Sequence, residues 1–115
     1  MQFRDLKKQY ELLKPKIDVG IQEVINESSF ILGKPVTDLE KVLADYTGRK
    51  YCITCASGTD ALVLALKAHN VGKGDAVFVP DFTYIASASC ASLVGATPVF
   101  VDIDLKTFNM NPEAL

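Results

Sequence analysis

Four small polar residues, Ser57-Gly58-Thr59-Asp60, have the types and the spacing to bind an anion. The run before them, YCITCA, is rich in β-branched and aromatic residues typical of a strand, and the run after them, ALVLALKAHN, has apolar residues at helical spacing. The start of a helix exposes backbone N–H donors and the positive end of the helix dipole. Because Gly58 lets a ligand approach the backbone and Thr59 adds a hydroxyl, this segment can form a phosphate seat.

The same residues also match a capping box, which requires no ligand. Ser57 can accept a hydrogen bond from the third helical N–H, and Asp60 can reach back to the N–H of Ser57. The carboxylate of Asp60 would repel a bound phosphate unless it turns back into this cap or faces a cation. The residues alone therefore leave two interpretations open, a simple helix cap and a phosphate seat.

Other candidate residues carry less functional weight. Cys52 and Cys55 form a C-x-x-C pair, but at this spacing in a strand they point to opposite faces, so we expect buried thiols and no metal site. The chain has no G-x-x-x-x-G-K-[ST] motif and no strand followed by G-x-G-x-x-G. Phe82 and Tyr84 follow the apolar run AVFVP, where an aromatic ring can stack on a flat cofactor.

The hydrophobic pattern predicts the elements that position these residues. We expect helices over residues 15–29, 36–48, 58–70 and 83–95, and strands over residues 51–56, 76–80 and 97–104. Pro15 suits the first turn of the first helix, and Gly48 suits the end of the second. AVFVP is apolar throughout, as expected of a strand that is buried on both faces.

This order of strands and helices predicts an α/β fold with a parallel sheet and crossover helices. Ligands of such sheets bind beyond the carboxyl ends of the strands, where both Ser57-Gly58-Thr59-Asp60 and Tyr84 are expected. Near the end of the sequence, Asn111 and Pro112 have the pattern of a helix start. We therefore expect these 115 residues to be the N-terminal part of a larger domain that is incomplete at its C-terminus.

Composition excludes several classes of protein. The 49% share of hydrophobic residues is sufficient for a packed core, and the net charge of −2 argues against a nucleic-acid partner. No apolar run is long enough to cross a bilayer and the N-terminus has no apolar signal core, so we expect no membrane partner. The three cysteines argue against a disulfide framework, which favours a cytoplasmic location.

Three stretches resemble the DegT/DnrJ/StrS family of aminotransferases that depend on pyridoxal 5'-phosphate (PLP) and act on nucleotide-linked keto sugars. They are FILGKPVTDLEKVLADYTGRKYCITCASGTDAL, GDAVFVPDFTYIASA, and GATPVFVDID with TFNMNP. The segments S-G-T-D-A-L and P-x-F-T-Y are the most specific. The resemblance implies an aspartate-aminotransferase-like large domain (PLP fold type I) with a mostly parallel sheet. Residues 1–48 would form an N-terminal helical segment, and residues 49–115 the first β-α-β-α-β part of the PLP-binding domain.

The resemblance also implies roles for individual residues. Gly58 and Thr59 match the positions that hold the PLP phosphate, and Ser57 and Asp60, which flank them, are expected to bind the cofactor as well. Tyr84 matches the aromatic residue that stacks on the pyridine ring, with Phe82 as the alternative. The family works as dimers with the active site at the subunit interface, and the loop of residues 30–33 is expected near that site.

The family's Schiff-base lysine and the carboxylate that pairs with the pyridine nitrogen are expected beyond Leu115. We accordingly expect the isolated chain to be inactive. The activity that the resemblance implies is transfer of an amino group, with glutamate as donor, to a UDP- or dTDP-linked keto sugar in polysaccharide or deoxysugar biosynthesis. Two alternatives are a sugar dehydratase of the same family, in which a histidine replaces the lysine, and a non-catalytic phosphate-binding or assembly module.

Overall fold

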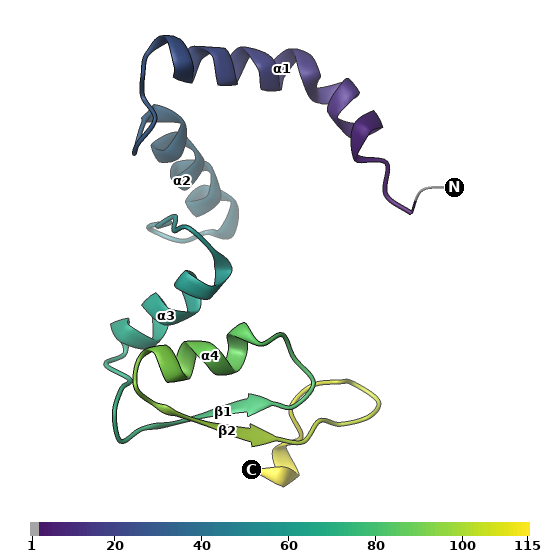
Figure 1. Ribbon diagram of the computed structural model, residues 1–115, viewed down its shortest axis with the longest axis vertical. Helices are drawn as coiled ribbons and strands as arrows, with labels where there is room; N and C mark the ends of the chain where they lie inside the picture. Colours follow the sequence, from purple (N-terminus) through teal and green to yellow (C-terminus); the bar gives the residue numbers. More distant parts are fainter. Residues whose placement is uncertain (1–2) are drawn as a thin grey trace. The chain divides into compact units, whose positions relative to one another are not determined.

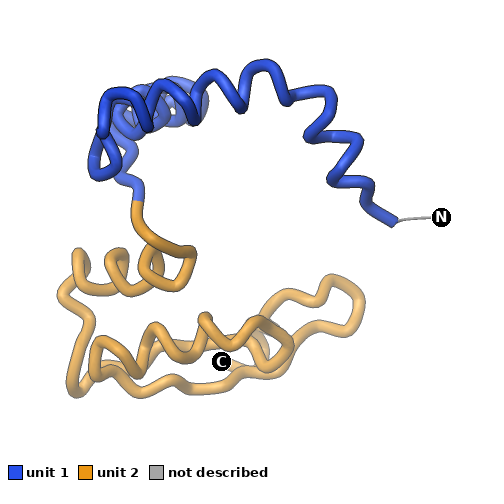
Figure 2. Tube along the Cα trace, turned by 45° about the horizontal axis from the view of Figure 1, so that its top comes forward, with its two compact units in different colours: residues 1–54 blue, residues 55–115 orange. Residues whose placement is uncertain are grey.

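The computed structural model describes residues 3–115, and the chain divides into two compact units, Met1–Thr54 and Cys55–Leu115 (Figure 2). Unit 1 contains two helices, α1 (Leu6–Asn26) and α2 (Lys34–Thr47). Unit 2 contains α3 (Gly58–Ala68), β1 (Ala76–Pro80), α4 (Ala86–Leu93), β2 (Thr97–Val101) and the short 3-10 helix η1 (Pro112–Ala114). Within residues 3–115, no helix combines the length and the apolar character that a bilayer span requires.

Helix α1 begins at Leu6, so the prediction that Pro15 stands in its first turn is wrong. The helix starts early because the side chain of Asp5 caps it, accepting a hydrogen bond from the N–H of Lys8 at 2.9 Å. Pro15 lies inside the helix, where it can donate no backbone hydrogen bond. The ribbon of α1 changes direction along its length, as expected of a helix with an internal proline (Figure 1).

An exposed polar network spans the turn that contains Pro15. The hydroxyl of Tyr10 donates to Asp18 at 2.8 Å, and the ammonium of Lys14 forms an ion pair with the same carboxylate. This pairing raises the pKa of Lys14 and lowers the pKa of Asp18. Side-chain bonds at helical spacing therefore support α1 on both sides of its proline.

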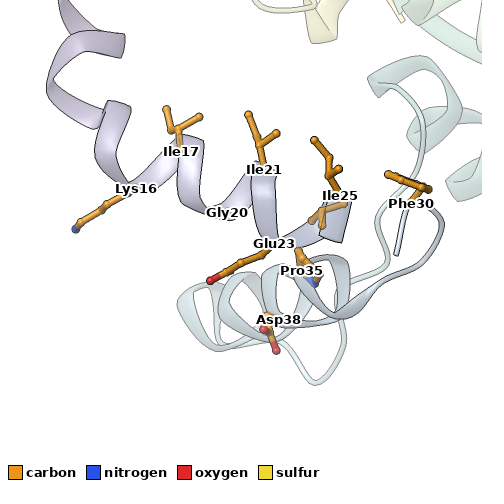
Figure 3. A pocket seen from close by; sticks show the side chains of 10 residues that line it. Lys16, Ile17, Gly20, Ile21, Glu23, Ile25, Phe30, Pro35 and Asp38 are labelled. Carbon is orange, nitrogen blue, oxygen red and sulfur yellow. The ribbon is translucent and has the colours of Figure 1, made fainter. Parts of the chain in front are cut away.

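Unit 1 carries an apolar groove with a volume of about 620 Å³, lined by residues of α1, α2 and the loop between them (Figure 3). Ile17, Ile21 and Ile25 project to the same side of α1, because they recur every four residues. Lys16, Glu23 and Asp38 add charged groups to the lining. Part of α1 thus has its apolar side chains on one side, as the helical pattern used to predict residues 15–29 implies.

Helix α2 ends as predicted at Gly48, which adopts the left-handed conformation with φ of 65°. A Cβ built on Gly48 would meet no atom within 4 Å. The demand for glycine at this position therefore comes from the backbone conformation and not from crowding.

The predicted strand over residues 51–56 is absent, because the segment has no neighbouring strand to pair with in the described part of the chain. A strand requires inter-strand hydrogen bonds, and here a side chain takes their place. One carboxylate oxygen of Glu40 accepts from the N–H and from the hydroxyl of Thr54, both at 2.8 Å. These two bonds lower the pKa of Glu40.

Unit 2 is built on two parallel strands that are joined through α4. Ala76 pairs with Thr97 and Pro80 with Val101, so the carboxyl ends of β1 and β2 lie side by side. Helix α4 lies along one face of this pair (Figure 1). The parallel pairing and the crossover helix confirm the predicted α/β arrangement.

Small side chains allow α4 to pack closely on the sheet. Its buried residues are Ala86, Cys90 and Ala91, and they face a core that includes Val79, which is 2% exposed, and Val101. The prediction that β1 is buried on both faces is wrong, because Phe78 remains 49% exposed. In the described residues the sheet has only two strands, so one helix layer cannot enclose all of its apolar side chains.

Gly48 and Gly20 provide a matched pair of substitutions. We expect Gly48→Ala to lower the free energy of unfolding by about 1 kcal/mol, since alanine is strained in the left-handed conformation. Gly20 lies inside α1 with no atom within 4 Å of a built Cβ, so Gly20→Ala should raise it by about 0.5–1 kcal/mol. Chemical denaturation of both variants checks the signs, and equal effects would contradict the proposed role of φ at Gly48.

The contact between Glu40 and Thr54 predicts a pH dependence. Because the pKa of Glu40 is lowered by the bonds from Thr54, the contact stabilises the fold above the ordinary glutamate pKa and is lost as the pH falls through the lowered value. Thr54→Val removes the hydroxyl and keeps the backbone N–H, so it should move the pKa of Glu40 part of the way back. An NMR titration of the carboxyl carbon measures this, and a wild-type pKa at or above the ordinary value would refute it.

Candidate phosphate-binding site

A pocket in unit 2 brings together four of the predicted site residues. Ser57, Gly58, Thr59 and Tyr84 all line it, with a volume of about 560 Å³. Three further lining residues, Leu62, Ala86 and Ser87, were not predicted. Pockets that hold small ligands and cofactors have volumes in this range. We call this space the α3 pocket.

The sequence contains a signal for the three residues that were missed. Leu62 lies four residues after Gly58 and therefore on the same face of α3. Ala86 and Ser87 open α4, directly after the predicted aromatic residue. Their small size leaves the pocket open between the first turns of α3 and α4.

The start of α3 is fixed by Ser57. Its backbone is extended, and its hydroxyl oxygen accepts a hydrogen bond from the N–H of Asp60, the third residue of the helix, at 3.1 Å. Its carbonyl oxygen accepts from the N–H of Ala61 at 3.0 Å. The first half of the predicted capping box is therefore confirmed.

The second half of the box differs from the prediction. The carboxylate of Asp60 does not accept from the N–H of Ser57; it accepts from the Ser57 hydroxyl, at 3.0 Å. A serine hydroxyl can donate one proton and accept at the same time, so the two side chains satisfy each other. Asp60 does not belong to the lining of the α3 pocket, and its charge is held beside the pocket by Ser57.

Donors in the first turn of α3 are free to bind a ligand. Among residues 3–115, the N–H groups of Gly58 and Thr59 and the hydroxyl of Thr59 have no hydrogen-bond partner. A Cβ built on Gly58 would meet no atom within 4 Å, so the backbone is open to a ligand on that side. Free N–H groups at the positive end of a helix form a site for a phosphate or another oxyanion.

Tyr84 is the aromatic residue that lines the α3 pocket. It follows the carboxyl end of β1 by four residues, is 76% exposed, and is available to contact a ligand. Phe82, the alternative, does not line the pocket, and its ring packs against Phe108 with the centroids 5.7 Å apart. Of the two predicted aromatic residues, Tyr84 therefore lines the α3 pocket and Phe82 does not.

The partner of Phe82 belongs to a tight loop after β2. Phe108 has a φ of 59°, and its N–H donates to the carbonyl of Asp104 at 2.8 Å. The carboxylate of Asp104 accepts from the N–H groups of Thr107 at 2.8 Å and Lys106 at 3.0 Å, which lowers the pKa of Asp104. The loop fixes Phe108 beside Phe82 without any side chain in the α3 pocket.

The expectation that the thiols of Cys52 and Cys55 are buried is wrong, whereas Cys90, for which no burial was predicted, is buried. Cys52 is half-buried and Cys55 is exposed, because the segment that carries them has no sheet to cover it. The thiol of Cys55 donates to the carbonyl of Ser57 at 3.3 Å. In the part of the chain that the structure describes, no three His, Cys, Asp or Glu residues are grouped to hold a metal ion.

Comparisons with a family model and with curated proteins both match this chain to sugar aminotransferases or their family. The model of the DegT/DnrJ/EryC1/StrS aminotransferase family matches residues 12–115. The UDP-2-acetamido-2-deoxy-3-oxo-D-glucuronate aminotransferase of Pseudomonas aeruginosa is 52% identical over 115 residues, which are 100% of this chain and 32% of that protein. The chain thus spans about a third of the length of this curated relative.

Solved structures agree in fold. A DegT DnrJ EryC1 StrS aminotransferase from Brucella abortus matches with a TM-score of 0.92 and 46% identity over 98% of this chain and 30% of that one. The PLP form of the putative sugar aminotransferase Spr1654 from Streptococcus pneumoniae matches with a TM-score of 0.71 and 39% identity, over 83% of this chain and 26% of that one.

The parallel α/β unit is therefore a part of the PLP-dependent aminotransferase fold. With a family match that extends over residues 12–115, the chain belongs to the DegT/DnrJ/EryC1/StrS aminotransferase family.

Proposed function

We propose that this chain supplies the phosphate seat of a PLP-dependent aminotransferase that moves an amino group, with glutamate as donor, to a UDP- or dTDP-linked keto sugar. The observation that carries the proposal is the α3 pocket, where free N–H donors and an exposed aromatic ring line one space. The name of the Pseudomonas aeruginosa relative, an aminotransferase of a UDP-linked 3-oxo sugar, supports the substrate class.

The chemistry of the donors fits the phosphate of PLP. The N–H groups of Gly58 and Thr59 and the hydroxyl of Thr59 would hold the phosphate oxygens, aided by the dipole of α3. No Lys, Arg or His of residues 3–115 lines the α3 pocket, so these neutral donors carry the binding that this chain provides. The open backbone at Gly58 allows the anion to approach the N–H groups closely.

Tyr84 would contact the ring of the cofactor through its aromatic face. Its position on the same pocket as the phosphate donors supports this role. When bound, PLP supplies the electron-withdrawing ring through which aminotransferases exchange amino groups. The chain's own residues bind and orient it, while the Schiff-base lysine of the family is expected outside residues 1–115.

We further propose that the full-length protein is a homodimer with the active site at the subunit interface, as expected for this family, and that the loop of residues 30–33 lies near that site. A cytoplasmic location is part of the proposal. It is supported by the unpaired state of Cys52, Cys55 and Cys90, since free thiols persist in reducing compartments.

Substitutions in the seat test cofactor binding in the full-length protein. Thr59→Val removes one donor to a charged group and should raise the dissociation constant of PLP about tenfold. Gly58→Ala places a methyl group in the open space beside the N–H donors and should raise it as well, with no loss of thermal stability, because the methyl meets no protein atom.

Thr97→Val is the matched control, since Thr97 opens β2 at the end of the sheet opposite to Tyr84 and lies outside the α3 pocket. Cofactor absorbance after dialysis against graded PLP concentrations gives the constants. If Thr59→Val and Gly58→Ala bind PLP as wild type does, the assigned seat is wrong.

Product analysis tests the activity. The full-length protein, incubated with glutamate and UDP- or dTDP-linked keto sugars, should form an aminated sugar and 2-oxoglutarate, detected by mass spectrometry. A deoxygenated sugar without nitrogen would show the dehydratase alternative instead. Dimerisation without PLP absorbance would favour the non-catalytic module and overturn the proposed function.

A further inference from the structure

Ser57 lines the α3 pocket, yet its hydroxyl proton is already used. The hydroxyl donates to Asp60 at 3.0 Å and accepts from the N–H of Asp60 at 3.1 Å. A hydroxyl has one proton, so the Ser57 hydroxyl presents only lone pairs to a ligand in the pocket. Lone pairs repel the oxygens of a phosphate dianion, which carries no proton to share.

The charge of Asp60 acts in the same direction. Its carboxylate lies 3.0 Å from the Ser57 hydroxyl oxygen, an atom of a pocket-lining residue, and no basic side chain of residues 3–115 lines this pocket to compensate it. A carboxylate in the first turn of α3 stabilises the helix through its dipole. The same carboxylate opposes any anion at the free N–H groups of Gly58 and Thr59.

We propose that Asp60 is a positioning residue that keeps the affinity of the seat for phosphate low. It withdraws the Ser57 hydroxyl from the seat and adds a negative charge beside it. A lone phosphate then binds weakly, whereas a phosphate ester with an aromatic ring gains a second contact at Tyr84 and is retained. This inference rests on the proposed function and changes the implied role of Asp60 from a contact of the cofactor to a restraint on its phosphate site.

The expected gain in phosphate affinity on removal of the Asp60 charge is set by Coulomb repulsion and by its screening in salt. Removal of one charge beside a phosphate dianion at an exposed site should strengthen binding about three- to tenfold at low salt. The gain should shrink at about 0.15 M salt, where the screening length is about 8 Å. A role in helix capping alone gives neither the gain nor its dependence on salt.

Asp60→Asn tests the effect of the charge alone, because the amide oxygen can still accept from the Ser57 hydroxyl. Asp60→Ala removes the charge and also frees that hydroxyl for a ligand. Asp75→Asn is the matched control: it makes the same change in net charge, and Asp75 caps the N–H of Gly72 at 2.8 Å outside the α3 pocket. Each variant is made in the full-length protein and stripped of PLP.

Three constants are measured for each protein: the dissociation constants of PLP and of pyridoxal, which lacks the phosphate, and the inhibition constant of inorganic phosphate against PLP rebinding. We expect Asp60→Asn to lower the PLP and phosphate constants by the same three- to tenfold at low salt and to leave pyridoxal unchanged. Asp60→Ala should lower them at least as far, despite a lower melting temperature from the lost bond to the Ser57 hydroxyl and the lost charge in the first turn of α3. Asp75→Asn should match wild type.

The outcomes separate this inference from the proposed function. Wild-type protein that binds PLP no better than pyridoxal has no phosphate seat, and both proposals fail. Wild-type protein that prefers PLP, with Asp60→Asn unchanged, weakened, or altered equally for pyridoxal, retains the proposed function and overturns the inference. A gain that Asp75→Asn reproduces would also overturn it, since it would reflect net charge alone.

Discussion

The hydrogen bond from the N–H of Asp60 to the hydroxyl oxygen of Ser57 determines where α3 begins, and the candidate site depends on that start. With the N–H groups of Asp60 and Ala61 bonded to Ser57, those of Gly58 and Thr59 stay free for a ligand. A start displaced by one residue would expose other donors and turn Thr59 to another face of the helix. The helix cap and the proposed phosphate seat are thus parts of one arrangement.

The sheet supplies the second half of the site. Because β1 and β2 are parallel, the chain must cross back over the pair, and α4 does so with alanine, serine and cysteine side chains that allow close packing. This places Tyr84, just before α4, on the same pocket as the first turn of α3. The small residues Ala86 and Ser87 leave the space between the ring and the free N–H donors open.

Local patterns in the sequence were sufficient to predict α2 with its end at Gly48, the cap of α3, and the parallel strands. Features that depend on residues far away in the sequence were not predictable from these local patterns. The strand expected over residues 51–56 requires a neighbour, and without one in the described residues the N–H of Thr54 bonds to Glu40. The start of α1 differs from the prediction because an N-cap at Asp5 and the Tyr10–Asp18 bond outweigh an internal proline.

Asp60 shows why residue type alone left its role open. A carboxylate at the third position of a helix stabilises the helix through the dipole, and the same dipole is what attracts a phosphate to the free N–H groups. The Asp60 carboxylate and a bound phosphate therefore compete for the same positive end of the α3 dipole. Since the hydrogen bond to Ser57 holds the carboxylate beside the pocket instead of inside it, the donors remain accessible and only their strength is reduced. In the proposed function, a seat of neutral donors that is weakened in this way would gain its selectivity from the proposed ring contact at Tyr84 and from groups supplied outside these residues.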